Sequence, residues 1–208
     1  MKKLNSLLIV GFIAFTSINA KAQKFTEGDE SLAFLMGQTK INLEYVYDGM
    51  MVGKKTEAEY KAEKVEHYNK KQPGKGDRWA EKWVNSRTMV YEPMFEELIN
   101  KMLTKGKTGA MVARNQKDAK YTLVVKTIML EPGFNSFAMK VNPYCDFEVA
   151  WLETSTKKVM AKAFMNNVPG VVVNDNDWDF DPSNRIKECY AKAGKMVGSK
   201  MAKKMKNK

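Results

Sequence analysis

The chain has 208 residues, with 35 Lys or Arg, 24 Asp or Glu and one His, which gives a formal net charge of +11. A single histidine excludes metal sites built from several histidines and argues against Ser–His or Cys–His catalysis. No phosphate-binding or dinucleotide-binding glycine motif is present. The sequence therefore predicts no catalytic residue and no cofactor. It leaves open only carboxylate-based hydrolysis, whose two acids can lie far apart along a chain.

The first 22 residues have the three parts of a cleavable signal peptide. Lys2 and Lys3 are followed by an apolar stretch over residues 7–15 and by the small-x-small sequence over residues 20–22. We expect cleavage after Ala22, which leaves residues 23–208 as a single α/β domain with a charge of +8. A retained membrane anchor is the alternative, although the apolar stretch is shorter than a typical transmembrane helix.

The first predicted strand covers residues 39–47, where apolar and polar side chains alternate. A capping box begins at Thr56 and predicts a charged helix to Lys71. The Pro–Gly sequence over residues 72–76 ends that helix. Two more helices are expected to start at Asp77 and near Pro93, each with an apolar stripe.

The second half of the chain has the two-residue period of strands. Residues 121–130 are apolar on both faces, which is typical of a central strand. Residues 146–153 and 158–165 alternate and predict a hairpin. A last helix begins after Asp181. The order predicts a two-layer α/β (α+β) domain, with a mixed, mostly antiparallel sheet of about four strands and helices packed on it.

Two groups of residues suggest binding sites. Trp79, Trp83 and Trp178 could form an aromatic platform for a glycan or small ligand, although Trp79 and Trp83 also have the spacing of a buried helix face. Asp175, Asp177 and Asp179 offer oxygen ligands that suit calcium, but the loop lacks the glycine and glutamate of an EF-hand. A solvated loop anchored by its aromatic residues is the alternative.

The last helix raises two further questions. Cys145 and Cys189 are both expected to face the core, so they could form a disulfide in an oxidising compartment or remain buried thiols. The helix is rich in lysine, which suits peripheral contact with an anionic membrane or simply the helix dipole. Gly194 and Gly198 indicate close packing against the sheet or another chain.

Several segments resemble a group of exported α/β proteins of Bacteroides-type bacteria. They are residues 37–41 (GQTKI), 73–79 (PGKGDRW), 91–95 (YEPMF), 131–134 (EPGF) and 185–190 (RIKECY). The element order is also similar to the small α/β domain of envelope proteins such as the curli-secretion lipoprotein and the N-terminal domain of the Tol-system propeller protein. The first resemblance transfers no site, and the second implies a scaffolding role in the envelope.

These observations favour an exported, non-enzymatic envelope protein that binds a protein partner or an anionic envelope polymer. Outside the cytoplasm a basic chain meets anionic polymers, head groups or acidic proteins, and nucleic acid is not expected as a partner. A dispersed lysine surface that only confers solubility is the plain alternative. A glycan-binding module and a carboxylate-based hydrolase are the alternative functions, and the sequence leaves the oligomeric state open.

Overall fold

The structure is a computed structural model and describes residues 24–135, 140–171 and 181–205. Its centre is an eight-stranded mixed sheet in which six strands follow the order β1-β10-β9-β6-β2-β5, while β3 pairs with β6 and β4. The strands are β1 Lys24–Gly28, β2 Lys40–Val46, β3 Met51–Val52, β4 Lys55–Thr56, β5 Met111–Arg114, β6 Tyr121–Glu131, β9 Tyr144–Glu153 and β10 Val159–Pro169. A separate small ribbon joins β7 Phe134–Asn135 to β8 Lys140–Val141.

The predicted α/β class is confirmed, but the expectation of about four strands was too low. The four predicted strands are present as β2, β6, β9 and β10, and the last two form the expected hairpin. The others are mostly short edge segments. The sheet is also more mixed than predicted, because β2 runs parallel to both of its neighbours, β5 and β6.

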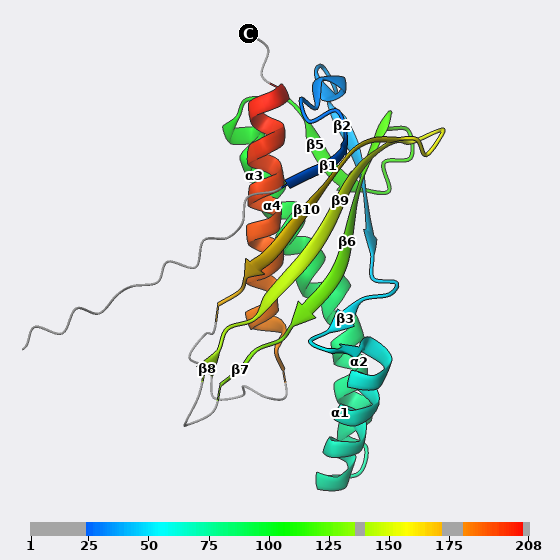
Figure 1. Ribbon diagram of the computed structural model, residues 1–208, viewed down its shortest axis with the longest axis vertical. Helices are drawn as coiled ribbons and strands as arrows, with labels where there is room; N and C mark the ends of the chain where they lie inside the picture. Colours follow the sequence, from blue (N-terminus) through cyan, green and yellow to red (C-terminus); the bar gives the residue numbers. More distant parts are fainter. Residues whose placement is uncertain (1–23, 136–139, 172–180, 206–208) are drawn as a thin grey trace, which may run out of the picture.

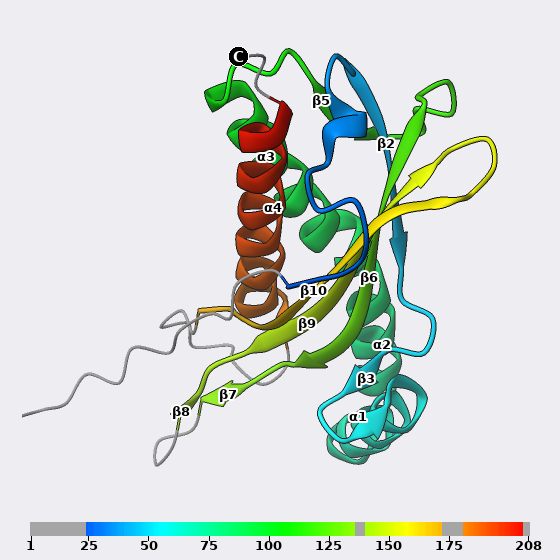
Figure 2. The ribbon, with the colours of Figure 1, turned by 45° about the horizontal axis from the view of Figure 1, so that its top comes forward.

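The helices are α1 Glu57–Lys71, α2 Lys75–Ser86, α3 Glu92–Lys105 and α4 Ser183–Met205, with a short 3₁₀ turn at Ala33–Leu35. Figures 1 and 2 show α3 and α4 lying together on one side of the sheet. Inward side chains of β6, β9 and β10 alternate along each strand and form the core beneath α4. They include Leu123, Val125, Phe147, Val149, Trp151, Ala161 and Ala163.

Helices α3 and α4 approach so closely that their contact depends on glycine. A Cβ atom added to Gly194 would lie 2.4 Å from the carbonyl oxygen of Phe95, and one added to Gly198 would lie 2.6 Å from that of Ile99. Such contacts are well inside normal packing distances. The expectation that this stripe docks on the sheet was therefore wrong, because its partner is the backbone of α3.

The start of α4 is fixed by Asp181, as the sequence predicted. Its carboxylate accepts a hydrogen bond from the backbone N–H of Ser183 at 3.0 Å and forms an ion pair with the Lys82 ammonium at 2.6 Å. Burial opposes ionisation of Asp181, but these two donors outweigh it and hold the pKa of the carboxyl below its usual range. The ion pair also ties α2 to the beginning of α4.

The two helices expected at Asp77 and Pro93 are one unbroken helical run. Helix α2 continues through a five-residue π-helical turn, Arg87–Tyr91, directly into α3. Pro93 lies at the start of α3, where a missing N–H costs little. The sequence pattern did not predict this π-helical turn.

Helices α1 and α2 form a hairpin that extends beyond the end of the sheet, at the opposite end of the molecule from the last turn of α4 (Figures 1 and 2). The capping box predicted at Thr56 is present in full, with Thr56 and Glu59 exchanging hydrogen bonds. The two helices touch at Gly76, where an added Cβ would lie 2.2 Å from the carbonyl oxygen of Val65.

Several predictions concern residues that the structure does not describe. The signal peptide over residues 1–22, the acidic residues Asp175, Asp177 and Asp179, and Trp178 all lie outside the described ranges. Within the described ranges, none of the helices combines the length and the apolar character that crossing a membrane requires.

Candidate functional site

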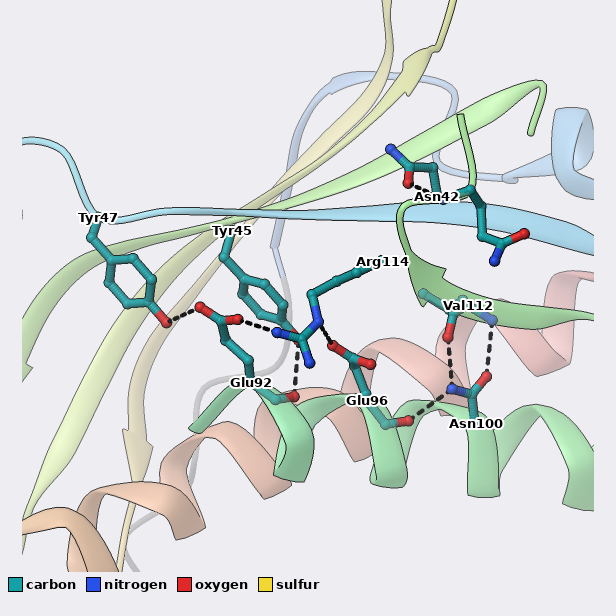
Figure 3. A network of polar contacts seen from close by, with 9 residues as sticks. Asn42, Tyr45, Tyr47, Glu92, Glu96, Asn100, Val112 and Arg114 are labelled. Carbon is teal, nitrogen blue, oxygen red and sulfur yellow. Dashed lines mark hydrogen bonds and ion pairs between the residues drawn. The ribbon is translucent and has the colours of Figure 1, made fainter. Parts of the chain in front are cut away.

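The first turns of α3 carry the most strongly buried acid of the described chain. Glu92 is 5% exposed, and its carboxylate pairs with Arg114 of β5 at 2.8 Å. Glu96, one helical turn later, pairs with the same guanidinium at 2.6 Å. Figure 3 shows Arg114 lying between the two carboxylates. The spacing of four residues places both acids on the helix face that meets β2 and β5.

Tyr45 of β2 and Tyr47, which directly follows that strand, complete the surroundings of Glu92. The Tyr47 hydroxyl donates to a carboxylate oxygen of Glu92 at 3.2 Å, and the Tyr45 hydroxyl donates to its backbone carbonyl at 3.1 Å (Figure 3). Burial raises the pKa of both phenols well above the usual range, so they remain donors at any physiological pH. Burial also raises the pKa of Glu96, and Glu92 adds to the shift while Arg114 opposes it.

The network continues along β5 through neutral side chains. The amide of Asn100 donates to the carbonyl of Val112 at 2.7 Å and accepts from its N–H at 2.9 Å (Figure 3). Asn42 in β2 accepts from the backbone N–H of Gln116 at 2.9 Å. Asn100 thus occupies the outer edge of β5, which otherwise would expose unpaired backbone groups. These contacts attach α3 to the sheet.

This arrangement does not supply the geometry of a carboxylate hydrolase. Such enzymes need one acid on each side of a bond in an open cleft, whereas Glu92 and Glu96 are clamped by one guanidinium against the sheet. Within residues 24–135, 140–171 and 181–205 no three His, Cys, Asp or Glu side chains are grouped to hold a metal ion. We conclude that the network positions α3 and, through it, the helical hairpin.

A hollow of about 380 Å³ lies beside Tyr47, where the hairpin joins the sheet. Arg87, in the π-helical turn, stacks on the Tyr47 ring at 4.3 Å and pairs with Glu57 at the start of α1. The indole N–H of Trp83 donates to the same carboxylate at 2.6 Å. Asp48 also lines the hollow, so two carboxylates and one guanidinium surround it. The contacts among Glu57, Trp83 and Arg87 fix the base of the hairpin.

The predicted aromatic platform is not formed by the two tryptophans of α2. Trp79 is 1% exposed and Trp83 is 5% exposed. They stack on each other at 5.4 Å and pack against Tyr60 and Tyr68 of α1. The facing helix α1 covers Trp79 and Trp83 and makes them the core of the hairpin, as the alternative of a buried helix face predicted.

The hairpin and the residues that adjoin it carry an excess of basic residues. The two helices contain seven Lys or Arg and six Asp or Glu, and the adjoining Lys54, Lys55 and Arg87 raise the basic count to ten over residues 54–87. Several of the acids are already paired within the molecule, including Glu63 with Lys55, Glu66 with Lys70 and Glu57 with Arg87. The aromatic residues face inward, so the outward surface of this projecting element is formed mainly by charged side chains, with a small excess of basic ones.

Cys145 of β9 and Cys189 of α4 meet in the core, as the strand and helix patterns predicted. Both are fully buried free thiols. Burial and the hydrogen bond between the two thiols raise the pKa of Cys145 well above its usual range. The pair is unsuited to nucleophilic catalysis, and its contact meets the first geometric requirement for a disulfide.

Comparison with known proteins finds no matching family model and no matching curated protein. Among solved structures, the PelC dodecamer from Paraburkholderia phytofirmans is similar over 84% of this chain and 97% of its own, at 12% identity and a TM-score of 0.39. A Xanthomonas campestris protein of family DUF330 is similar over 51% of this chain and 57% of its own, at 16% identity and a TM-score of 0.29. These likenesses define neither family nor function, and the resemblances noted in the sequence stay predictions.

Proposed function

We propose that this chain is an exported, non-enzymatic protein of the cell envelope that binds an anionic polymer through the basic hairpin of α1 and α2. One observation carries the proposal. The hairpin extends away from the sheet (Figure 1) and buries its aromatic residues internally, and together with the adjoining Lys54, Lys55 and Arg87 it contains ten basic and six acidic residues. A long-range positive potential of this kind attracts and retains polyanions.

The rest of the molecule supports a binding role rather than a catalytic one. The acids that converge on Arg114 are used to attach α3 to the sheet, and the only histidine, His67, is exposed on α1. The signal-peptide pattern over residues 1–22 supports work in the periplasm or outside the cell, where acidic polysaccharides occur. No enzyme chemistry is assigned to the chain.

A protein partner is the second candidate, and one observation favours it. On the same helical run Met89 is 75% exposed and Val84 is 40% exposed, so two large apolar side chains are available for contact with a partner. Contact between the lysines of α4 and an anionic membrane is weaker as a candidate, because most of that helix is buried against α3 and the sheet.

The test uses purified residues 23–208 and two polysaccharides of similar length, polygalacturonate and neutral dextran. We expect binding to polygalacturonate in calorimetry at low ionic strength and a steep loss of affinity between 50 and 500 mM salt, because exposed charges are screened over about 10 Å at 0.1 M. Dextran should not bind. Equal binding to both polymers, or none to either, would contradict the proposal. Cross-linking in envelope fractions of the native host then tests the protein partner.

A further inference from the structure

Helices α3 and α4 end side by side, at the end of the molecule opposite the hairpin. Their close contacts advance in the same direction along both helices, so the two helices are parallel. These contacts join Phe95 to Gly194, Ile99 to Gly198 and Gly106 to Ala202. Gly106 directly follows the last residue of α3, and Ala202 is in the last turn of α4. The two C-termini therefore form one surface (Figures 1 and 2).

The side chains at these two helix ends are basic or neutral. The last acid of α3 is Glu97 and the last acid of α4 is Glu188. Within the part of the chain that the structure describes, four exposed ammonium groups at these ends have no ion-pair, hydrogen-bond or ring partner. They belong to Lys101 and Lys105 of α3, Lys107 of the turn that follows and Lys203 of the last turn of α4.

Two acids on the adjoining loops are already engaged with other lysines. Asp118 pairs with Lys40 at 2.8 Å, and this ammonium holds the pKa of the Asp118 carboxyl below its usual range. Asp29 attracts Lys204 electrostatically, and Glu30 is exposed beside it. We therefore leave Lys204 out of the site and count only the four unpaired lysines.

The helix dipoles account for only part of this positive charge. A helix C-terminus carries about −0.5 elementary charge, so two parallel helices present about one negative charge at this end. The four lysines supply four positive charges. Lys101 and Lys105 are also four residues apart on α3, where like charges slightly destabilise a helix. Most of the charge is therefore available to an external anionic partner.

Two large apolar side chains are exposed at the same end of the molecule. Met111, the first residue of β5, is 53% exposed, and Met36, which precedes β2, is 49% exposed. The N–H of Met111 donates to the carbonyl of Thr39 at 2.9 Å, so the two segments lie side by side. A polymer dissolved in water gains little from methionine, whereas the interfacial region of a membrane accepts apolar side chains together with lysines.

We propose that this surface docks on a membrane of anionic phospholipid. The lysines contact headgroup phosphates and the two methionines enter the interface. Helix α4 alone exposes too few lysines at its end, but α3 and the turn after it supply the others. Four basic residues are enough to form such a cluster. The hairpin then points away from the membrane (Figure 1), so this contact neither requires nor obstructs the proposed binding of a polymer.

The experiment compares two variants of residues 23–208 that lose the same charge at opposite ends. K105Q/K107Q/K203Q removes the helix-end lysines, and the control K54Q/K71Q/R78Q removes exposed basic residues in and beside the hairpin. Flotation at 0.1 M salt measures binding to vesicles that contain phosphatidylglycerol and to vesicles of phosphatidylcholine alone. We expect the wild type to bind only the anionic vesicles. The first variant should bind them about 100-fold more weakly, because each lysine near such a surface contributes about fivefold.

The control should bind the anionic vesicles within about twofold of the wild type, because its charges lie far from the surface compared with the screening length of about 10 Å. M36T/M111T should bind about tenfold more weakly, since it removes the apolar contribution. K105R/K107R/K203R keeps the charge and should retain binding, which separates loss of charge from loss of fold.

Four results would overturn the proposal. They are no binding to either kind of vesicle, equal binding to both kinds, equal weakening by the two charge variants, and unchanged binding of M36T/M111T. If K105Q/K107Q/K203Q loses polygalacturonate but keeps the vesicles, this surface is a polymer site and the membrane contact is wrong. A wild-type chain that binds anionic vesicles but not polygalacturonate supports the membrane contact while the proposed function fails.

Discussion

Replacing Gly194 with alanine tests the closest contact in the fold. The new methyl carbon would lie 2.4 Å from the carbonyl oxygen of Phe95 and 3.0 Å from its Cα. Ordinary carbon–oxygen contacts are about 3.3 Å or longer, so α3 and α4 would have to separate by close to 1 Å. That movement would loosen the buried side chains that both helices share, at a cost of about 1 to 3 kcal/mol.

The expected sign is opposite to that of the same substitution on a free helix. In a helix open to solvent, Gly→Ala stabilises by about 1 kcal/mol. Here we expect the free energy of unfolding to fall by about 2 kcal/mol and the melting temperature by about 4 to 8 °C for a domain of this size. Urea unfolding of residues 23–208, followed by circular dichroism, measures the free energy of unfolding of G194A and of the wild type. Thermal unfolding of the same two proteins gives their melting temperatures.

The control is Lys195→Ala, at the exposed neighbouring position of the same helix, where we expect a change within about 0.5 kcal/mol. A more stable G194A protein would mean that α3 and α4 do not touch through their backbones. The packing of the helical layer, and the placement of Glu92 that depends on it, would then be wrong.

Three more predictions concern buried polar groups. Oxidation should join Cys145 to Cys189 and remove both free thiols in a thiol assay. The disulfide should add about 4 kcal/mol to the free energy of unfolding, because it closes a loop of about 44 residues. Two reactive thiols after oxidation and unfolding would refute this prediction. Arg114→Met should cost about 3 kcal/mol in urea unfolding by leaving Glu92 buried without a counter-charge, and E92Q in the same chain should recover part of that loss. Because the pKa of Asp181 is lower in the folded state, its ionised carboxylate stabilises the fold above about pH 4, and this stabilisation is lost as the pH falls through the folded-state pKa. D181N should therefore be less stable than the wild type at pH 7 and equal to it near pH 2.

The long elements could be predicted because their patterns persist over many residues. Strands β2, β9 and β10 alternate, β6 is apolar on both faces, and the capping box marks the start of α1. The missed strands have little pattern of their own. Strands β3 and β4 have two residues each, and β1 is set by its pairing with β10, more than 130 residues later. Such pairing is determined by the tertiary fold, which a local period does not encode.

The candidate site, like the fold, could be predicted only in part from the sequence. The spacing of Trp79 and Trp83 is compatible with a core or a platform, and only the position of α1 decides for the core. The pairing of Glu92 with Arg114 joins residues from different elements and leaves no motif.

The π-helical turn over Arg87–Tyr91 shifts the helical phase between α2 and α3. It is flanked on both sides by regular α-helix, so every residue before it is offset in phase from every residue after it. A π-helical turn holds one residue more than an α-helical turn, because its hydrogen bonds span five residues instead of four. Deleting one residue there should close the turn into regular α-helix and leave the direction of the hairpin almost unchanged. Deleting one residue within α2 would instead rotate the part of the hairpin before it by about 100°, the angle per residue of an α-helix, so the π-helical turn is where this helical run best tolerates a change of length.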